Sequence, residues 1–302
     1  MKLSSFRKTH MLTTTPGERL TGYPAVVLLL FIPVMLIAQL GRSGIYAVAS
    51  SLLPSGTPGA VYLLMQLFAT VATIAAVLLY CLLAEKRSLT SLGFCGRGAV
   101  VEYAVGLCGG ILLFGGAVLL CVLTRTVTVH LSSGGVSWGL FALYLLGFLI
   151  QGMSEEMLCR SYLMVSLSRG WPLWACAVTN ALLFSLLHIG NPGVTVIALV
   201  NIFLFGLFAS MLTLRRGSIW MVGALHSMWN FAQGNFFGIP VSGITGSPSP
   251  LVSIPETGTW AKLIHGGTFG LEAGLAVTVI LGLACVIMLF LPTKKSEITQ
   301  SS

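Results

Sequence analysis

The sequence contains very few charged residues for its length. Only 8% of its 302 residues are charged and only eight are acidic, whereas 56% are hydrophobic. A soluble globular domain has about 25% charged residues, so this composition excludes an ordinary soluble protein. The net charge of +8 comes from lysines and arginines that flank apolar segments, and we do not expect a nucleic-acid partner.

A disulfide framework is also missing from the sequence. The seven cysteines are scattered, no CxxC pair occurs, and most of them lie inside apolar runs. We therefore interpret the cysteines as small core residues.

Apolar segments account for most of the chain. A transmembrane helix needs about 20 mostly apolar residues. The sequence predicts an all-α polytopic membrane protein with about eight such helices, at 24–40, 59–84, 103–124, 137–153, 172–190, 195–214, 218–236 and 270–291. The stretch 237–269 is rich in Gly, Pro and Ser and is predicted to be an outer loop.

The distribution of lysine and arginine predicts the orientation in the membrane, because these residues favour cytoplasmic loops. The alternate loops hold only Arg42, Arg125 and Lys262. Both termini are therefore expected in the cytoplasm. The basic residues assigned to that side are Lys2, Arg7, Lys8, Arg19, Lys86, Arg87, Arg97, Arg169, Arg215, Arg216, Lys294 and Lys295.

A first polar cluster, Glu155, Glu156 and Arg160, follows the fourth apolar run. Ionisable groups in membrane segments are costly and usually functional. Glu156 and Arg160 are spaced i,i+4 in the favourable order for a helical ion pair. Glu155 points elsewhere, so we expect it to be left for chemistry or for a second partner. The alternative is a charge cluster at the interfacial end of a helix.

Two further clusters contain histidine. Phe184 precedes His188 by one turn and can pack on its ring, and His226 and Asn230 are spaced i,i+4 on one helix. Each cluster also has a simple structural explanation. A lone histidine at a helix end is often interfacial, and a His–Asn pair can hold two membrane helices together.

The spacing of these residues predicts that they meet. At about 1.5 Å per residue, Glu155 and His188 lie at similar depths on either side of the turn at 169–172. His226 reaches that depth if the 156–172 hairpin projects about 10 Å into the cytoplasm. We therefore expect one site inside the membrane, reached from the cytoplasmic side.

In order, the three clusters resemble the three motifs of the CPBP intramembrane proteases. This family, also called Abi, contains the CAAX prenyl endopeptidases and bacteriocin-processing or immunity proteins. The resemblance is centred on 150–236 and is supported by "RRGSIWMVGALHSMWN" and by "TSLGF" before the third span. The stretches "GNFFGIPVSG" and "GGTFGLEAG" resemble a bacterial subgroup, which implies a multi-pass protein of the bacterial plasma membrane.

This resemblance implies an intramembrane endopeptidase that cuts a membrane-associated peptide or protein. It also implies three parts: 1–134 with the first three helices, a catalytic core at 135–236, and 237–302 with the outer loop and last helix. The residue roles that it implies are Glu155 as general base, His188 as its partner on the water, His226 and Asn230 as the oxyanion hole, and Glu156, Arg160, Phe184 and Asn201 as supporting residues.

A metal mechanism would use the same side chains. Two histidines and one glutamate form the zinc ligand set of several hydrolases, with a fourth position open for water. Glu155, His188 and His226 could supply that set. The sequence has no HExxH motif, which argues against an ordinary zincin. Catalysis by glutamate alone and catalysis with Zn²⁺ both remain open.

Other functions compete with proteolysis. Buried Glu, His and Arg also form the proton relays of transporters, although no inverted repeat is visible. A non-catalytic scaffold or immunity protein is the third class. Cys159 is not predicted to be a nucleophile, because an apolar helix disfavours the thiolate. His10, His130 and His265 are predicted to be surface residues.

Overall fold

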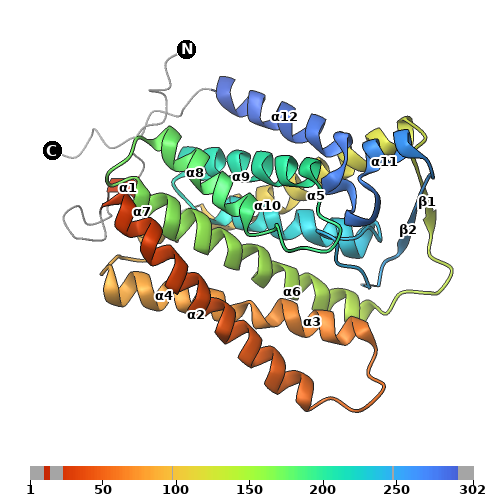
Figure 1. Ribbon diagram of the computed structural model, residues 1–302, viewed down its shortest axis with the longest axis horizontal. Coiled ribbons are helices and arrows are strands. Elements are labelled where there is room, and N and C mark those ends of the chain that lie inside the picture. Colours follow the sequence, from red (N-terminus) through yellow and green to blue (C-terminus); the bar gives the residue numbers. More distant parts are fainter. Residues whose placement is uncertain (1–9, 14–22, 97, 247, 292–302) are drawn as a thin grey trace.

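The computed structural model describes residues 10–13, 23–96, 98–246 and 248–291, and these residues are mostly helical (Figure 1). The predicted all-α membrane architecture is confirmed. Within the described residues, five helical segments are long and apolar enough to cross a membrane: Pro24–Ser51, Gly59–Ala84, Ala99–Leu123, Trp138–Leu167 and Val196–Arg216. Two shorter apolar helices span Leu173–Leu186 and Leu275–Phe290.

The main helices begin near the predicted starts of the apolar segments, but the first and fourth helical segments extend beyond their predicted ends, to Ser51 and Leu167. The helices are α1 (His10–Thr13), α2 (Pro24–Ser51), α3 (Gly59–Ala69), α4 (Val71–Leu79), α5 (Ala99–Leu123), α6 (Trp138–Glu156), α7 (Val165–Leu167), α8 (Leu173–Leu186), α9 (Val196–Arg216), α10 (Trp220–Phe231), α11 (Thr259–His265) and α12 (Leu275–Phe290). Short 3₁₀ turns cover Thr90–Leu92, Gly267–Phe269 and Leu271–Ala273.

Three helices widen into π-helical segments. Tyr80–Ala84 extends α4, Met157–Met164 joins α6 to α7, and Ala232–Phe236 extends α10. The second begins directly after Glu156 and contains Arg160, and the third begins two residues after Asn230. Such π segments are rare and often occur at functional sites.

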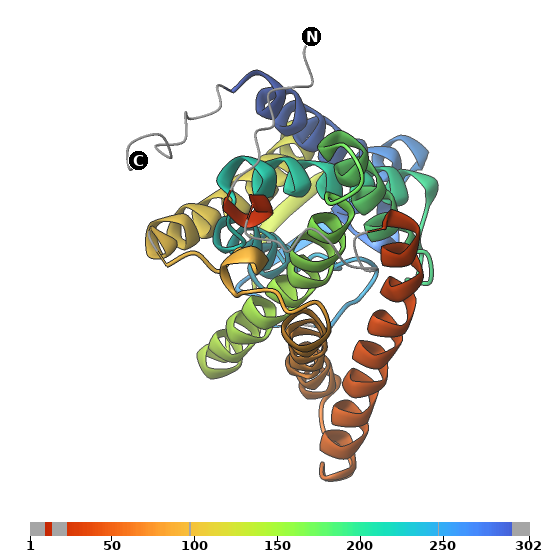
Figure 2. The same cartoon turned by 90° about the vertical axis from the view of Figure 1, so that its left-hand side faces the viewer.

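Helix α10 lies at the centre of the packing, between α5 and α6, while α8 packs on α9 and α12 covers α9. Glycines allow the close approach of α5 to α10. A Cβ atom on Gly106 or Gly110 would collide with the backbone carbonyl of Met221 or Leu225. Small residues commonly permit such contacts between membrane helices. Helix α2 lies at the edge of the bundle, with α3 and α4 beside it (Figure 2).

The outer loop contains regular structure that the sequence did not predict. Strand β1 (Val127–Leu131) pairs antiparallel with β2 (Leu251–Pro255), so that Val129 lies opposite Ser253. Helix α11 follows β2. The prediction that His265 is a surface residue is wrong, because its side chain is only 3% exposed. Its ring nitrogens bind the backbone of Glu256 and Gly267 at 3.0 and 3.1 Å.

Arg42 also lies elsewhere than predicted. The first span was expected to end at residue 40 and to leave Arg42 in an outer loop. Instead α2 continues to Ser51, because the apolar stretch "GIYAVAS" prolongs the helix beyond the arginine. Arg42 is therefore a charged residue within a membrane helix, about 13 Å from its end at 1.5 Å per residue.

Some basic residues used to predict the orientation cannot be placed. Lys2, Arg7, Lys8, Arg19, Arg97, Lys294 and Lys295 lie outside the described residues, as does the side chain of His10.

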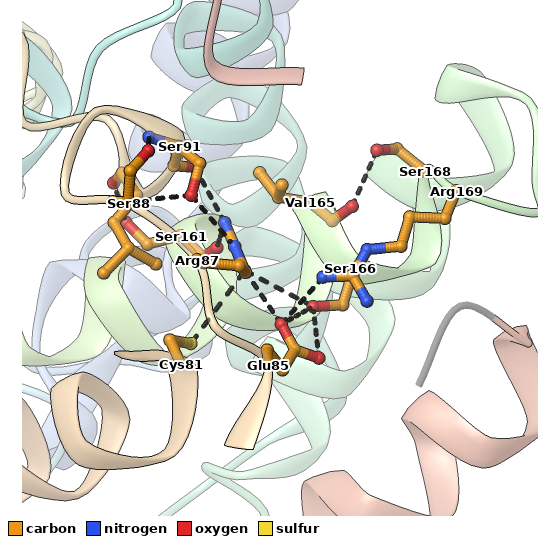
Figure 3. A network of polar contacts seen from close by, with 11 residues as sticks. Cys81, Glu85, Arg87, Ser88, Ser91, Ser161, Val165, Ser166, Ser168 and Arg169 are labelled. Atoms are coloured by element: carbon orange, nitrogen blue, oxygen red, sulfur yellow. Dashed lines mark hydrogen bonds and ion pairs between the residues drawn. The ribbon is translucent and has the colours of Figure 1, made fainter. Parts of the chain in front are cut away.

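Arg87 and Arg169 meet in a buried network at one end of the bundle (Figure 3). Both bind Glu85 Oε2, Arg87 at 3.4 Å and Arg169 at 2.9 Å, and Ser166 Oγ donates to the same oxygen at 3.0 Å. Arg87 also donates to the carbonyl of Ser161 at 2.8 Å. This Glu85 cluster (Glu85, Arg87, Ser161, Ser166 and Arg169) attaches the segment after α4 to the π segment and α7.

Candidate active site

Helices α6 and α10 bring two carboxylates and an imidazole together. His226 Nδ1 lies 2.8 Å from Glu156 Oε1, and His226 Nε2 lies 3.7 Å from Glu155 Oε2. His226 is buried, and it packs against the ring of Phe205 at 4.8 Å between centroids. The third cluster therefore meets the first, 70 residues away in the sequence.

Glu156 forms the ion pair that its spacing predicts. Its Oε1 atom lies 2.9 Å from Arg160 Nη1, and both side chains are fully buried. The Arg160 guanidinium also donates to the carbonyl of Gly206 and lies 4.4 Å from the ring centre of Phe184. Glu156 thus joins α6, the following π segment and α10. Removing one member of such a buried pair leaves an uncompensated charge.

Glu155 has different surroundings from its neighbour. Its side chain is 28% exposed, and Gln151 Nε2 donates to its Oε1 atom at 2.6 Å. Asn230 Nδ2 in turn donates to Gln151 Oε1 at 3.0 Å. Gln151 thereby connects the carboxylate to the amide of the third cluster.

The sequence analysis missed Gln151, although a signal for it existed. It is a polar residue within the apolar run of α6, and it precedes Glu155 by one turn on the same helix face.

His188 lies just beyond the end of α8. Its Nδ1 atom is 2.8 Å from the carbonyl oxygen of Phe184, and the two rings are 4.9 Å apart between centroids. Since a carbonyl can only accept, His188 Nδ1 carries the hydrogen. In the neutral ring the Nε2 atom is then an acceptor.

These side chains line one cavity of about 480 Å³, which is within the usual range for ligand sites. The predicted residues on its wall are Glu155, Phe184, His188, Asn201, His226 and Asn230. Glu156 and Arg160 lie behind this wall. Cys159 also borders the cavity but is only 1% exposed.

Asn201 takes part in the packing of α9 against α12. Its Nδ2 atom donates to the carbonyls of Glu272 and Gly274 at 2.8 and 2.9 Å, and its Oδ1 atom accepts from Thr278 at 2.7 Å. Glu272 Oε2 accepts from the backbone N–H and the hydroxyl of Ser242. These bonds hold part of the outer loop at the cavity.

The arrangement does not fit a preformed three-ligand metal site. In the described part of the chain, no three His, Cys, Asp or Glu side chains lie close enough together to hold an ion. His226 and Glu155 approach each other, while His188 Nδ1 is occupied by its bond to the carbonyl of Phe184. His130, in β1, is exposed and does not line this cavity.

Comparison with known protein families identifies the core of the chain. Residues 137–232 match the family model described as type II CAAX prenyl endopeptidase Rce1-like. The matched segment contains all three polar clusters but less than half of the chain. It agrees with the family that the motifs predict, and this core is similar to the Rce1-like membrane proteases. A comparison with curated proteins found no match.

Proposed function

We propose that the protein is an intramembrane endopeptidase in which Glu155 activates a water molecule. The observation that carries this proposal is the contrast between two adjacent carboxylates. Glu156 is buried between Arg160 and His226, whereas Glu155 opens into the cavity beside His188 and His226. The substrate would be a membrane-associated peptide or protein, and the proposed location is the bacterial plasma membrane.

Hydrolysis requires a base, a stabilised oxyanion and a proton donor. Glu155 takes a proton from the water while His188 Nε2 accepts its second O–H and orients it. The water oxygen attacks the peptide carbonyl carbon, and negative charge develops on the carbonyl oxygen. Glu155 then returns the proton to the leaving amine as the C–N bond breaks.

His226 and Asn230 would stabilise the oxyanion. When His226 is protonated, Nδ1–H binds Glu156 and Nε2–H is directed toward the cavity. The Asn230 amide has two N–H groups, and Gln151 accepts only one of them. Both residues therefore have a donor left for the developing charge.

The test is cleavage of a quenched lipopeptide library by the purified protein in detergent. We expect Glu155→Gln to lower cleavage by about 10²–10⁴-fold, since general acid–base catalysis contributes about that factor. His226→Ala removes an oxyanion donor and should lower cleavage by about 10²–10³-fold. Glu256→Gln is the matched control, because this exposed glutamate lies outside the cavity. If all forms were stable and none cleaved any peptide, the proposal would be wrong.

A chelator arm of the same assay tests the proposed metal-free route. We expect cleavage to persist after treatment with EDTA. Loss of cleavage with EDTA, followed by recovery with Zn²⁺, would assign Glu155, His188 and His226 to a metal instead.

A further inference from the structure

Arg42 is a cation on the wall of the cavity. It lies within α2, is partly buried, and is the one Lys or Arg among the described lining residues. Glu155 and Glu272 are the acidic residues of that lining. A charged side chain in a membrane helix is costly and is by default a sign of function.

The Arg42 guanidinium has no acceptor among the described residues, where it makes neither a hydrogen bond nor an ion pair. The positive charge of Arg42 acts on Glu155, but the Glu155 carboxylate accepts a hydrogen bond from Gln151 and forms no ion pair with Arg42. Glu272 is held by Ser242 and Gln233. Arg42 therefore presents up to five unmet N–H donors beside the cavity.

The surroundings of Arg42 suit a polar ligand. Gln39, almost one turn earlier on α2, and Gln66 on α3 line the same cavity. Helices α2 and α3 pack together at one side of α6 (Figure 1). The catalytic groups come from α6, α8 and α10, so this α2–α3 wall (Gln39, Arg42 and Gln66) is a separate part of the cavity.

We propose that Arg42 binds a carboxylate of the peptide substrate, which rests on the proteolytic function proposed above. The guanidinium fork matches a carboxylate with two parallel hydrogen bonds, and this match is strongest away from water. Arg42 and Glu155 line the same cavity of about 480 Å³, and an extended residue spans about 3.3 Å. The bound carboxylate therefore lies within a few residues of the bond that is cut.

The carboxylate can be the C-terminus of the peptide or an acidic side chain near the bond. One peptide sequence in three forms separates these sources: a free acid, a C-terminal amide, and an amide with glutamate close to the cleaved bond. If the C-terminus is the ligand, the free acid alone is favoured. If a side chain is the ligand, the glutamate-containing amide alone is favoured.

The cleavage assay compares wild type, Arg42→Gln and Arg42→Lys on these peptides. We expect wild type to favour a carboxylate form over the plain amide at least tenfold in kcat/KM, mainly through KM. Arg42→Gln should remove this preference, and Arg42→Lys should retain part of it. Lys262→Gln is the control, because it removes an exposed charge outside the cavity. An equal loss on all peptides in Arg42→Gln would overturn the proposal.

Binding of the same peptides to Glu155→Gln and to Glu155→Gln/Arg42→Gln separates this inference from the proposed function. Selective binding of a carboxylate form that depends on Arg42, without cleavage by wild type, would refute proteolysis and support the site. Cleavage without any preference for a carboxylate would refute the site and support proteolysis.

Anionic lipid is the competing ligand. Mixed micelles with phosphatidylglycerol or phosphatidylcholine are added to the binding assay. We expect both lipids to leave peptide selectivity unchanged. Displacement of the peptide by phosphatidylglycerol alone, abolished in Glu155→Gln/Arg42→Gln, would assign Arg42 to a lipid phosphate and overturn the proposal.

Discussion

At the scale of single residues, the two neighbouring glutamates have different environments because they point to different sides of α6. Glu156 faces the packed interior and accepts bonds from Arg160 and His226. Glu155 faces the cavity and Gln151. Successive residues of a helix point about 100° apart. Glu156 can therefore stabilise the interior while the adjacent Glu155 is available for the proposed chemistry.

We therefore expect Glu156→Gln and Glu155→Gln to have opposite effects. Glu156→Gln leaves the Arg160 charge buried without its anion and should lower stability by about 3–5 kcal/mol. Glu155→Gln should abolish cleavage with little change in the unfolding temperature. Thermal unfolding in detergent measures both variants, and equal destabilisation would contradict this division of roles.

Gln151 should matter for catalysis more than for stability. Gln151→Ala removes the hydrogen bond to Glu155 and frees the Asn230 amide from its partner. Since a hydrogen bond to a charged group contributes about 1.5–3 kcal/mol, we expect kcat to fall by about 10–100-fold. KM should change little. A changed KM with normal kcat would instead place Gln151 in substrate binding.

At the scale of elements, the glycines of α5 determine how closely α5 packs on α10. Gly110→Ala should cost about 1–3 kcal/mol, because the added methyl group meets the Leu225 carbonyl and the Trp229 backbone. Gly115→Ala, in the same helix but with open space around it, should be neutral or stabilising. Unfolding temperatures test the pair, and similar losses would show that the contact is unimportant.

The Glu85 cluster also acts between elements, because it holds the end of the segment that carries Glu155, which is the end predicted to be cytoplasmic. Glu85→Gln leaves Arg87 and Arg169 without their shared carboxylate and should cost about 3–5 kcal/mol. Glu102→Gln breaks a pair with the half-exposed Arg216 and should cost less than about 1 kcal/mol. Equal unfolding temperatures for the two variants would contradict the importance of the cluster.

At the scale of the whole molecule, the β1–β2 sheet and the Glu85 cluster lie at opposite ends of α6 (Figure 1). If both termini lie in the cytoplasm, as the distribution of lysine and arginine predicts, the sheet faces outward. We expect His130→Cys to react with a membrane-impermeant maleimide on intact spheroplasts. Lys86→Cys should react only after permeabilisation, since both positions are exposed. The unsubstituted chain is the control, and the reverse labelling pattern would invert the proposed topology.

Local features were accessible from the sequence because short-range geometry governs them. Long apolar segments predict membrane helices, since the bilayer leaves no other way to satisfy the backbone. The i,i+4 spacing predicts the Glu156–Arg160 pair and the contact of Phe184 with His188, because helix geometry alone brings such residues together.

Contacts between distant segments were decided only by the tertiary structure. The bond of His226 to Glu156, the bridge from Glu155 through Gln151 to Asn230, and the burial of His265 all depend on how separate elements pack. Arg42 is the clearest case. Its sequence position suggested a loop, whereas the length of α2 and its packing on α3 place it in the cavity. Helical spacing cannot reveal which helices become neighbours, because that depends on the packing of the whole bundle.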